Sequence, residues 1–279
     1  MELKNMPCFG VAGNFTGHLE QAGEAKDFLN FKTKDTNAPK AVFPTYIPVS
    51  KPEFTPQFLT VFPFDSKKII FPKDENKLQI EPECAIICNL TWEKELIKRI
   101  TPVSFGASND CSIRKEGAKK ISEKKNWGKC SKGLSENLIA LDSFNSYSII
   151  NDYCIASFLI RDGKIYEYGQ NSLILNYSYI YEKLIFWLVD KLNNQSDEGP
   201  AENIHKYLLE AGKPESAMIS IGATRYTKWG EQNFLMNNDK TCIILYPQSK
   251  YSQADILKIV EKEDFKDPEI SVLFQTVQM

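Results

Sequence analysis

Residues 78–88 read LQIEPECAIIC and carry two glutamates one residue apart, Glu81 and Glu83. The surrounding residues are apolar and favour extended backbone, so the stretch predicts a β-strand. Side chains at positions i and i+2 of a strand project from the same face. We therefore expect Glu81 and Glu83 to lie side by side in a partly buried place, where each loses solvation and repels the other.

A third carboxylate, Asp110, follows in the block Asn109-Asp110-Cys111-Ser112-Ile113-Arg114. If it joins the pair, the three carboxylates form an all-oxygen site of the kind that suits Mg²⁺ or Mn²⁺. The alternative is a solvated strand face, because a chain with 36 acidic residues contains acidic-x-acidic pairs by chance. The pair alone does not decide between these interpretations.

The composition is that of a globular protein and excludes several classes of partner. The chain has 279 residues, 25% of them charged and 42% hydrophobic, with a net charge of −2. It lacks the large basic block that phosphate neutralisation needs, so we expect no nucleic acid. We expect no membrane partner, because no segment reaches about 18 uncharged apolar residues. The seven cysteines form no dense pattern, which favours a reducing, cytoplasmic location.

Strand signals dominate the chain, and helix signals are fewer. The Asp162-Gly163 pair, between two apolar runs, predicts a two-residue hairpin turn. Gly212 and Pro214 predict the end of a helix. The predicted strands cover residues 58–62, 68–71, 78–88, 153–161 and 241–246, and the predicted helices cover 15–22, 179–193, 201–211 and 252–263.

Several short motifs occur in a fixed order: Gly13-Asn14-Phe15-Thr16-Gly17-His18, Phe31-Lys32, Glu81-Pro82-Glu83, the Asn109 to Arg114 block, Trp127 with Lys132-Gly133, Gly222-Ala223-Thr224, and Phe234-Leu235 with Asp239. Together they make the chain resemble the fumarylacetoacetate hydrolase superfamily over roughly residues 8–246. The resemblance implies an α+β, β-rich fold: a mixed β-sheet roll with a few flanking helices. It implies one domain over 1–250, a C-terminal extension over 251–279 that packs on the domain or on a dimer partner, and a homodimer.

The resemblance also implies a function: a metal-dependent hydrolase or lyase that acts on a small 1,3-dicarbonyl or 2-oxo acid through a metal-stabilised enolate. It assigns Mg²⁺ or Mn²⁺ to Glu81, Glu83 and Asp110. The catalytic residues would be His18 with Glu20, as the base, and Lys132, which offsets negative charge. Lys32, Arg114 and Thr224 would bind the substrate, although Arg114 could instead hold Glu81 or Asp110 in place.

One departure from the family pattern concerns the base. Many relatives have a glutamate three residues after the histidine, where this chain has Gln21. Glu20 and Glu24 lie close by in the sequence and could take over that role. The metal set is therefore intact while the base set is altered, which indicates a divergent branch. The alternative function is a non-catalytic descendant of the same fold that binds a metabolite or a protein.

Overall fold

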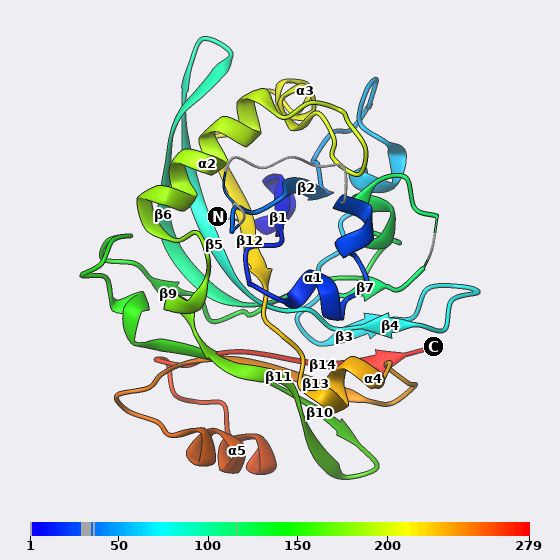
Figure 1. Ribbon diagram of the computed structural model, residues 1–279, viewed down its shortest axis with the longest axis vertical. Coiled ribbons are helices and arrows are strands. Elements are labelled where there is room, and N and C mark those ends of the chain that lie inside the picture. Colours follow the sequence, from blue (N-terminus) through cyan, green and yellow to red (C-terminus); the bar gives the residue numbers. More distant parts are fainter. Residues whose placement is uncertain (1, 29–34, 36, 116) are drawn as a thin grey trace.

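The computed structural model describes residues 2–28, 35, 37–115 and 117–279, and two curled β-sheets dominate it (Figure 1). The largest apolar cluster takes side chains from both sheets, among them Ile86 and Ile219 of one and Ile243 and Leu273 of the other. One core is thus shared by the two sheets. The β-rich α+β fold that the motifs implied is confirmed.

The larger sheet has seven strands and carries the candidate site. Its order is β2 (Ala41–Tyr46), β1 (Cys8–Ala12), β12 (Ser216–Ala223), β5 (Pro82–Glu93), β6 (Leu96–Asn109) and β8 (Gly133–Leu134), with β9 (Ile139–Ala140) also paired to β6. Strands β1 and β12 run parallel, and the other pairs run antiparallel, so the sheet is mixed.

Strands β5 and β6 form a long hairpin that determines where the acidic residues meet. Pro82 lies opposite Asn109, and Glu83 lies opposite Ser108. The backbone N–H of Asp110 donates to the carbonyl of Glu81 at 3.1 Å. The hairpin therefore brings Asp110 beside the glutamate pair at the end where β5 begins and β6 ends.

The second sheet has five strands, and a short two-stranded sheet lies apart from it. The order is β11 (Lys164–Leu173), β10 (Tyr153–Arg161), β13 (Lys240–Pro247), β14 (Ser271–Gln278) and β3 (Lys68–Ile70), and the short sheet pairs β4 (Leu78–Gln79) with β7 (Ser112–Ile113). Strand β14 lies between β13 and β3, so the last residues of the chain are inside the sheet. The division of the chain at residue 250 stays a prediction.

Helices flank the sheets, as expected. Helix α2 packs against β6 of the larger sheet, and α5 contributes Ile256 and Val260 to an apolar cluster with β10 and β13 (Figure 1). The α-helices are α1 (His18–Gln21), α2 (Tyr181–Asn194), α3 (Ile204–Glu210), α4 (Lys228–Gln232) and α5 (Gln253–Lys262). The 3-10 helices are η1 (Leu3–Asn5), η2 (Ala25–Phe28), η3 (Gln57–Thr60), η4 (Ile121–Lys124), η5 (Ile149–Asp152) and η6 (Ile174–Asn176). Within the described part of the chain, no helix has the length and apolarity to cross a membrane.

One predicted strand is divided and another is wrong. The predicted strand 78–88 is β4 and the start of β5, which belong to different sheets, with Ile80 and Glu81 between them. Residues 58–62 do not form a strand, because most of them belong to the 3-10 helix η3. Pro56 precedes the helix with a backbone suited to its start, and the Thr60 hydroxyl donates to the Gln57 carbonyl at 2.8 Å. These local hydrogen bonds outweigh the β-propensity of the apolar side chains.

Candidate metal centre

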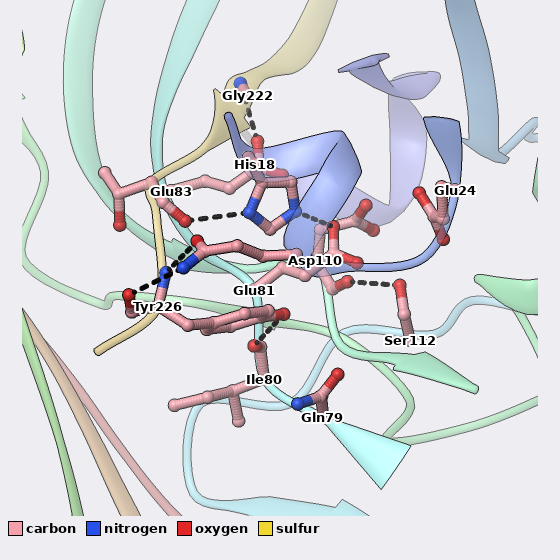
Figure 2. A network of polar contacts seen from close by, with 12 residues as sticks. His18, Glu24, Gln79, Ile80, Glu81, Glu83, Asp110, Ser112, Gly222 and Tyr226 are labelled. Atoms are coloured by element: carbon pink, nitrogen blue, oxygen red, sulfur yellow. Dashed lines mark hydrogen bonds and ion pairs between the residues drawn. The ribbon is translucent and has the colours of Figure 1, made fainter. Parts of the chain in front are cut away.

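Three carboxylates converge at the open end of the β5–β6 hairpin. Glu81 directly precedes β5, Glu83 lies in it, and Asp110 directly follows β6. One oxygen of each side chain lies within 4.8 Å of the others, and each residue is at most 3% exposed. Figure 2 shows the three side chains gathered around His18. The structure thus brings together the three residues that the sequence proposed as metal ligands.

Glu83 is held from the neighbouring strand β12. The backbone N–H of Gly222 donates to Glu83 Oε2 at 2.8 Å (Figure 2). Gly222 has φ +124° at an irregularity in the β12–β5 register, a conformation that only glycine adopts easily. Burial and the negative charges of Asp110 and Glu81 raise the pKa of Glu83 well above its ordinary value. Without a further cation, Glu83 therefore favours its neutral form.

Lys125 also belongs to the candidate site, although no sequence motif indicated it. Its Nζ lies 2.6 Å from Glu81 Oε2 and 2.8 Å from Asp110 Oδ2. It follows η4, in the lysine-rich segment before Trp127, and no spacing rule distinguishes it there from its neighbours. Burial lowers the pKa of Lys125, but the carboxylates of Asp110 and Glu81 outweigh it and raise the pKa overall. Lys125 is therefore a buried ammonium ion between two of the three candidate ligands.

Arg114 holds Glu81 from the other side. Its Nη2 lies 2.8 Å from Glu81 Oε1, and its Nη1 lies 2.9 Å from Glu24 Oε1. The same guanidinium donates to Gln79 Oε1 at 2.7 Å and to the Tyr226 hydroxyl at 2.7 Å. Although burial opposes ionisation of Glu81, Lys125 and Arg114 lower the pKa of this carboxyl overall. Glu81 is therefore the ionised member of the glutamate pair.

His18 lies at the start of α1 and faces the triad with one ring nitrogen. Its Nδ1 lies 2.8 Å from the carbonyl oxygen of Thr224, and its Nε2 lies 4.0 Å from Glu81 Oε2. A carbonyl only accepts, so the proton of the neutral ring sits on Nδ1. Burial lowers the pKa of His18, which favours this neutral ring. The lone pair of Nε2 then points toward the triad, with no hydrogen bond in the described structure.

Lys132 is fully buried beside Asp110. Its Nζ lies 3.3 Å from Asp110 Oδ1 and donates to the carbonyl of Cys111. The ammonium also lies 5.1 Å from the centre of the Trp127 ring. Burial lowers the pKa of Lys132, although the charge of Asp110 opposes this shift. The structure thus places this predicted catalytic residue next to a predicted ligand.

Two other predicted residues lie elsewhere or cannot be placed. Glu20 is exposed and lines a separate cavity with Thr16 and Lys40, because residues two apart on a helix project in nearly opposite directions. The structure instead brings Glu24 into the network, through Arg114. Lys32 lies outside the described residues.

Thr224 is 1% exposed and contacts His18 through its backbone carbonyl. Gln21, where relatives have an acid, binds the backbone of Tyr226: its Oε1 accepts from the N–H at 2.9 Å and its Nε2 donates to the carbonyl at 3.2 Å. A carboxylate could make only the first of these bonds. The departure at Gln21 therefore has a structural explanation.

A cavity of about 290 Å³ opens next to Arg114. Glu24, Gln79 and Arg114 form part of its wall, and all three belong to the network around Glu81. The lining also contains the carboxylate of Glu231 and four lysines: Lys26, Lys77, Lys115 and Lys124. Together with Arg114, these lysines outnumber the carboxylates of Glu24 and Glu231, so the lining has a net positive charge that suits a small anion. Arg114 also contacts Glu81 of the triad.

The donor set of the triad fits a hard divalent cation. All of its side-chain donors are carboxylate oxygens, and neither Asp110 carboxylate oxygen makes a hydrogen bond in the described structure. Asp110 Oδ2 lies 2.8 Å from the ammonium of Lys125, and Asp110 Oδ1 lies 3.3 Å from that of Lys132. Such oxygens are the ligands that Mg²⁺ and Mn²⁺ prefer. The residues present therefore fit a metal ion, provided that Lys125 withdraws.

Comparison with known proteins gives a family and a fold. A model described as a family of unknown function, DUF5718, matches residues 24–277. A comparison with curated proteins found no match. Among solved structures, Cg1458 with inhibitor is 14% identical with a TM-score of 0.56, covering 98% of this chain and 76% of that one.

Two further structures have similar folds. A 2-keto-3-deoxy-D-arabinonate dehydratase complexed with magnesium and 2,5-dioxopentanoate is 13% identical with a TM-score of 0.50, covering 98% of this chain and 72% of that one. A provisionally assigned fumarylacetoacetate isomerase/hydrolase from Oleispira antarctica is 14% identical with a TM-score of 0.51, covering 98% and 93%. These likenesses confirm the fold that the motifs implied.

Proposed function

We propose that this chain, which belongs to the DUF5718 family of unknown function, is a metal-dependent enzyme that acts on a small oxo acid. The observation that carries the proposal is the burial of Glu81, Glu83 and Asp110 together, at most 3% exposed. Buried carboxylates that share a site destabilise a fold unless cations offset their charge. Mg²⁺ and Mn²⁺ are the ions we propose. A neighbour in fold was solved with magnesium and 2,5-dioxopentanoate, which supports this choice.

The side chains around the triad suit such a substrate. A bound divalent cation supplies a Lewis acid that polarises a carbonyl. His18 holds its own proton on Nδ1 and offers Nε2 to take a proton from the substrate or from water. Lys132 offsets negative charge next to Asp110, and the basic cavity beside Arg114 attracts a substrate carboxylate. Thr224 orients His18 through its carbonyl.

Within this class, the base favours a lyase over a hydrolase. Glu20 is exposed, and Gln21 is occupied with the backbone of Tyr226. The carboxylate that pairs with His18 is Glu81, itself a candidate ligand. In the described structure, no second acid is thus set beside His18 to activate water. In a lyase, a single residue can take the proton from carbon and return it to the leaving oxygen, so the reaction needs no second acid beside His18.

A second candidate is a non-catalytic protein that keeps the fold and binds a metabolite or another protein. The ion pairs of Lys125 with Glu81 and Asp110 favour it, because they offset part of the triad's charge without a metal. This alternative predicts that Lys132→Ala leaves ligand binding intact, whereas an enzyme would lose turnover. The two functions therefore give different results for the same variant.

The deciding experiment is thermal unfolding with and without Mg²⁺ or Mn²⁺. Metal at ten to a hundred times its Kd stabilises the native state by roughly 1.4–2.7 kcal/mol, a visible rise in Tm. The rise should vanish in Glu83→Gln, whose amide oxygen still accepts from Gly222, and persist in the exposed Glu20→Gln. A rise would justify assaying 2-oxo acids for turnover, with Lys132→Ala inactive. No rise in the wild type would reject the metal-dependent function.

We also propose that the protein is a cytoplasmic homodimer. All seven cysteines are buried and free, which suits a reducing compartment. The dimer follows from the resemblance in sequence. Light scattering after size-exclusion chromatography measures the mass directly. The mass of one 31.9 kDa chain would reject the dimer.

A further inference from the structure

The space between Glu81 and Asp110 is taken by a side chain of the protein itself. Lys125 Nζ lies 2.6 Å from Glu81 Oε2 and 2.8 Å from Asp110 Oδ2. A Mg²⁺ ion binds carboxylate oxygens at about 2.0–2.1 Å. A metal bound to these same two oxygens would therefore overlap the ammonium position, and the two positive charges would repel each other in a site with little water.

The backbone on both sides of Lys125 is fixed by buried contacts. Ser122 of η4 donates its hydroxyl to Glu202 at 2.8 Å. On the other side, the Asn126 amide donates to the carbonyl of Thr45 at 2.8 Å and to that of Val61 at 3.0 Å. These anchors hold the Lys125 backbone in place, so its ammonium is always near the triad. Tethering of this kind gives an intramolecular ligand a high effective concentration.

The Lys125 side chain can reach more than one acidic group from the same backbone position. A lysine carries its charge at the end of a flexible four-carbon stem. In the structure, the Lys125 ammonium also lies 5.1 Å from the centre of the Phe43 ring. Glu24, which pairs with Arg114, is a second acidic group within reach. It lies near η4, because the Nζ of Lys124, the last residue of η4, is 3.9 Å from Glu24 Oε1. Withdrawal from the triad toward Glu24 would leave the ammonium close to a negative charge.

We propose that Lys125 is a tethered competitor of the metal ion, so that its ammonium and a divalent cation occupy the triad in turn. This inference rests on the proposed metal-dependent function. In the absence of metal, Lys125 offsets the charge of Glu81 and Asp110 and closes the site. A metal ion binds only by displacing it, which weakens the metal affinity of the native protein at least tenfold. Lys125 thereby sets the metal concentration at which the site fills.

The test compares Mn²⁺ binding by the wild type, Lys125→Met and Lys129→Met. Methionine keeps most of the length of the lysine stem without its charge, and Lys129 is an exposed lysine in the same segment. After removal of metal with a chelator, isothermal titration should give a Kd at least tenfold lower for Lys125→Met. The Kd of Lys129→Met should equal that of the wild type.

The outcomes separate this inference from the function on which it rests. Equal Kd values for the wild type and Lys125→Met would overturn the competition and leave the metal-dependent function standing. Binding by Lys125→Met alone would support Lys125 as the occupant of the site and reject metal dependence in the native protein. Binding by neither would overturn both.

A measurement on the wild type covers the case in which Lys125→Met does not fold. Crystals soaked in Mn²⁺ would show the metal by its anomalous scattering. A peak among Glu81, Glu83 and Asp110 with Lys125 withdrawn would support the competition. A peak there with Lys125 still bridging Glu81 and Asp110 would overturn it. No peak would also overturn it, because a displaceable competitor yields to excess metal.

Discussion

Arg114 joins the buried triad to the cavity. Its guanidinium reaches Glu81 on one side and Glu24 on the other, and both carboxylates are buried. A lysine has a single charged nitrogen and could not hold both carboxylates together with Gln79 and the Tyr226 hydroxyl. The planar fork of arginine therefore sets the distance between the proposed metal ligand and the proposed substrate cavity.

The variant Gln21→Glu tests whether Gln21, at the position where relatives have an acid, stabilises the fold through its bonds to Tyr226. In Gln21→Glu, the carboxylate keeps the bond from the Tyr226 N–H but loses the donor to the Tyr226 carbonyl. It also places a second charge near Glu231, which Gln21 contacts at 3.4 Å. We expect a loss of about 1–2 kcal/mol in the free energy of unfolding, measured by urea denaturation. Glu20→Gln, an exposed change beside it, should stay within about 0.5 kcal/mol. A Gln21→Glu protein as stable as the wild type would contradict this role.

At this scale, the sequence predicted the convergence of the three carboxylates better than the contacts around them. Glu83 lies in β5 and Glu81 directly before it, so alternation along extended backbone, a local rule, predicted that they lie close together. The block from Asn109 to Arg114 pointed to Asp110. Lys125 and Tyr226 approach Glu81 or its neighbours only through the tertiary fold. Glu20 is exposed while His18 is buried, because residues two apart on α1 project in nearly opposite directions.

Strand β12 shapes the site through its irregularity at Gly222. A Cβ at this position would meet the Asn14 Cβ at 3.0 Å, on a backbone with φ +124°. We expect Gly222→Ala to cost roughly 3 kcal/mol of unfolding free energy and to turn the N–H away from Glu83. Gly163→Ala measures the cost of a positive φ without a steric contact, because Gly163 has φ +74° and open space around it. This variant should lose about 1 kcal/mol of unfolding free energy. Equal losses in the two variants, by urea denaturation, would argue against the steric contact.

The contact between η4 and the start of α3 predicts a pH dependence. Burial raises the pKa of Glu202 to about 8, although its hydrogen bond from Ser122 opposes this. The folded protein thus holds a proton that the unfolded chain, with an ordinary carboxyl, releases above about pH 4.5. Stability from this group is therefore present at low pH and falls as the pH rises toward 8, by on the order of 3 kcal/mol between pH 5 and pH 8.

Glu202→Gln cannot ionise and should remove this slope. Urea unfolding of the wild type and the variant at pH 5 and pH 8 gives the difference, in which other titrating groups cancel. The exposed Glu198→Gln is the control and should follow the wild type. Parallel pH profiles for the wild type and Glu202→Gln would show that Glu202 is ionised in the fold.

Elements with strong local signals were predictable, and those that depend on partners were not. Strand β10 matches its prediction at both ends, and Asp162 and Gly163 both have positive φ in the hairpin turn, as a two-residue turn requires. Strand β6 was not predicted, because Pro102 interrupts its run of strand-forming residues. The sheet tolerates this proline because Pro102 lies opposite Cys88, beside the shift in the β5–β6 register between Ile87 and Cys88.

The whole molecule is tied together by its last strand. Gln275 of β14 is fully buried; its Oε1 accepts from the amide of Asn109 at 2.9 Å, and its Nε2 donates to the carbonyl of Asp65 at 2.8 Å. Ser271 Oγ accepts from the backbone N–H of Ala107 at 2.9 Å. The C-terminal strand therefore supports β6 immediately before Asp110. The motifs end near residue 246, and these hydrogen bonds join residues far apart in the sequence, so no local pattern indicates this support.

A chain that ends at residue 250 tests whether residues 251–279 are an extension or part of the core. Removal of β14 would expose the edges of β13 and β3 and leave the Asn109 amide without its partner. We expect the shortened chain to lose its near-ultraviolet circular dichroism and to unfold without a cooperative transition. Gln275→Leu in the full chain keeps the backbone pairing of β14, so it should still fold cooperatively, with a free energy of unfolding lower by about 1–3 kcal/mol. A shortened chain with the native spectrum and a sharp transition would instead establish a self-sufficient domain over 1–250, in which β14 contributes only an added edge.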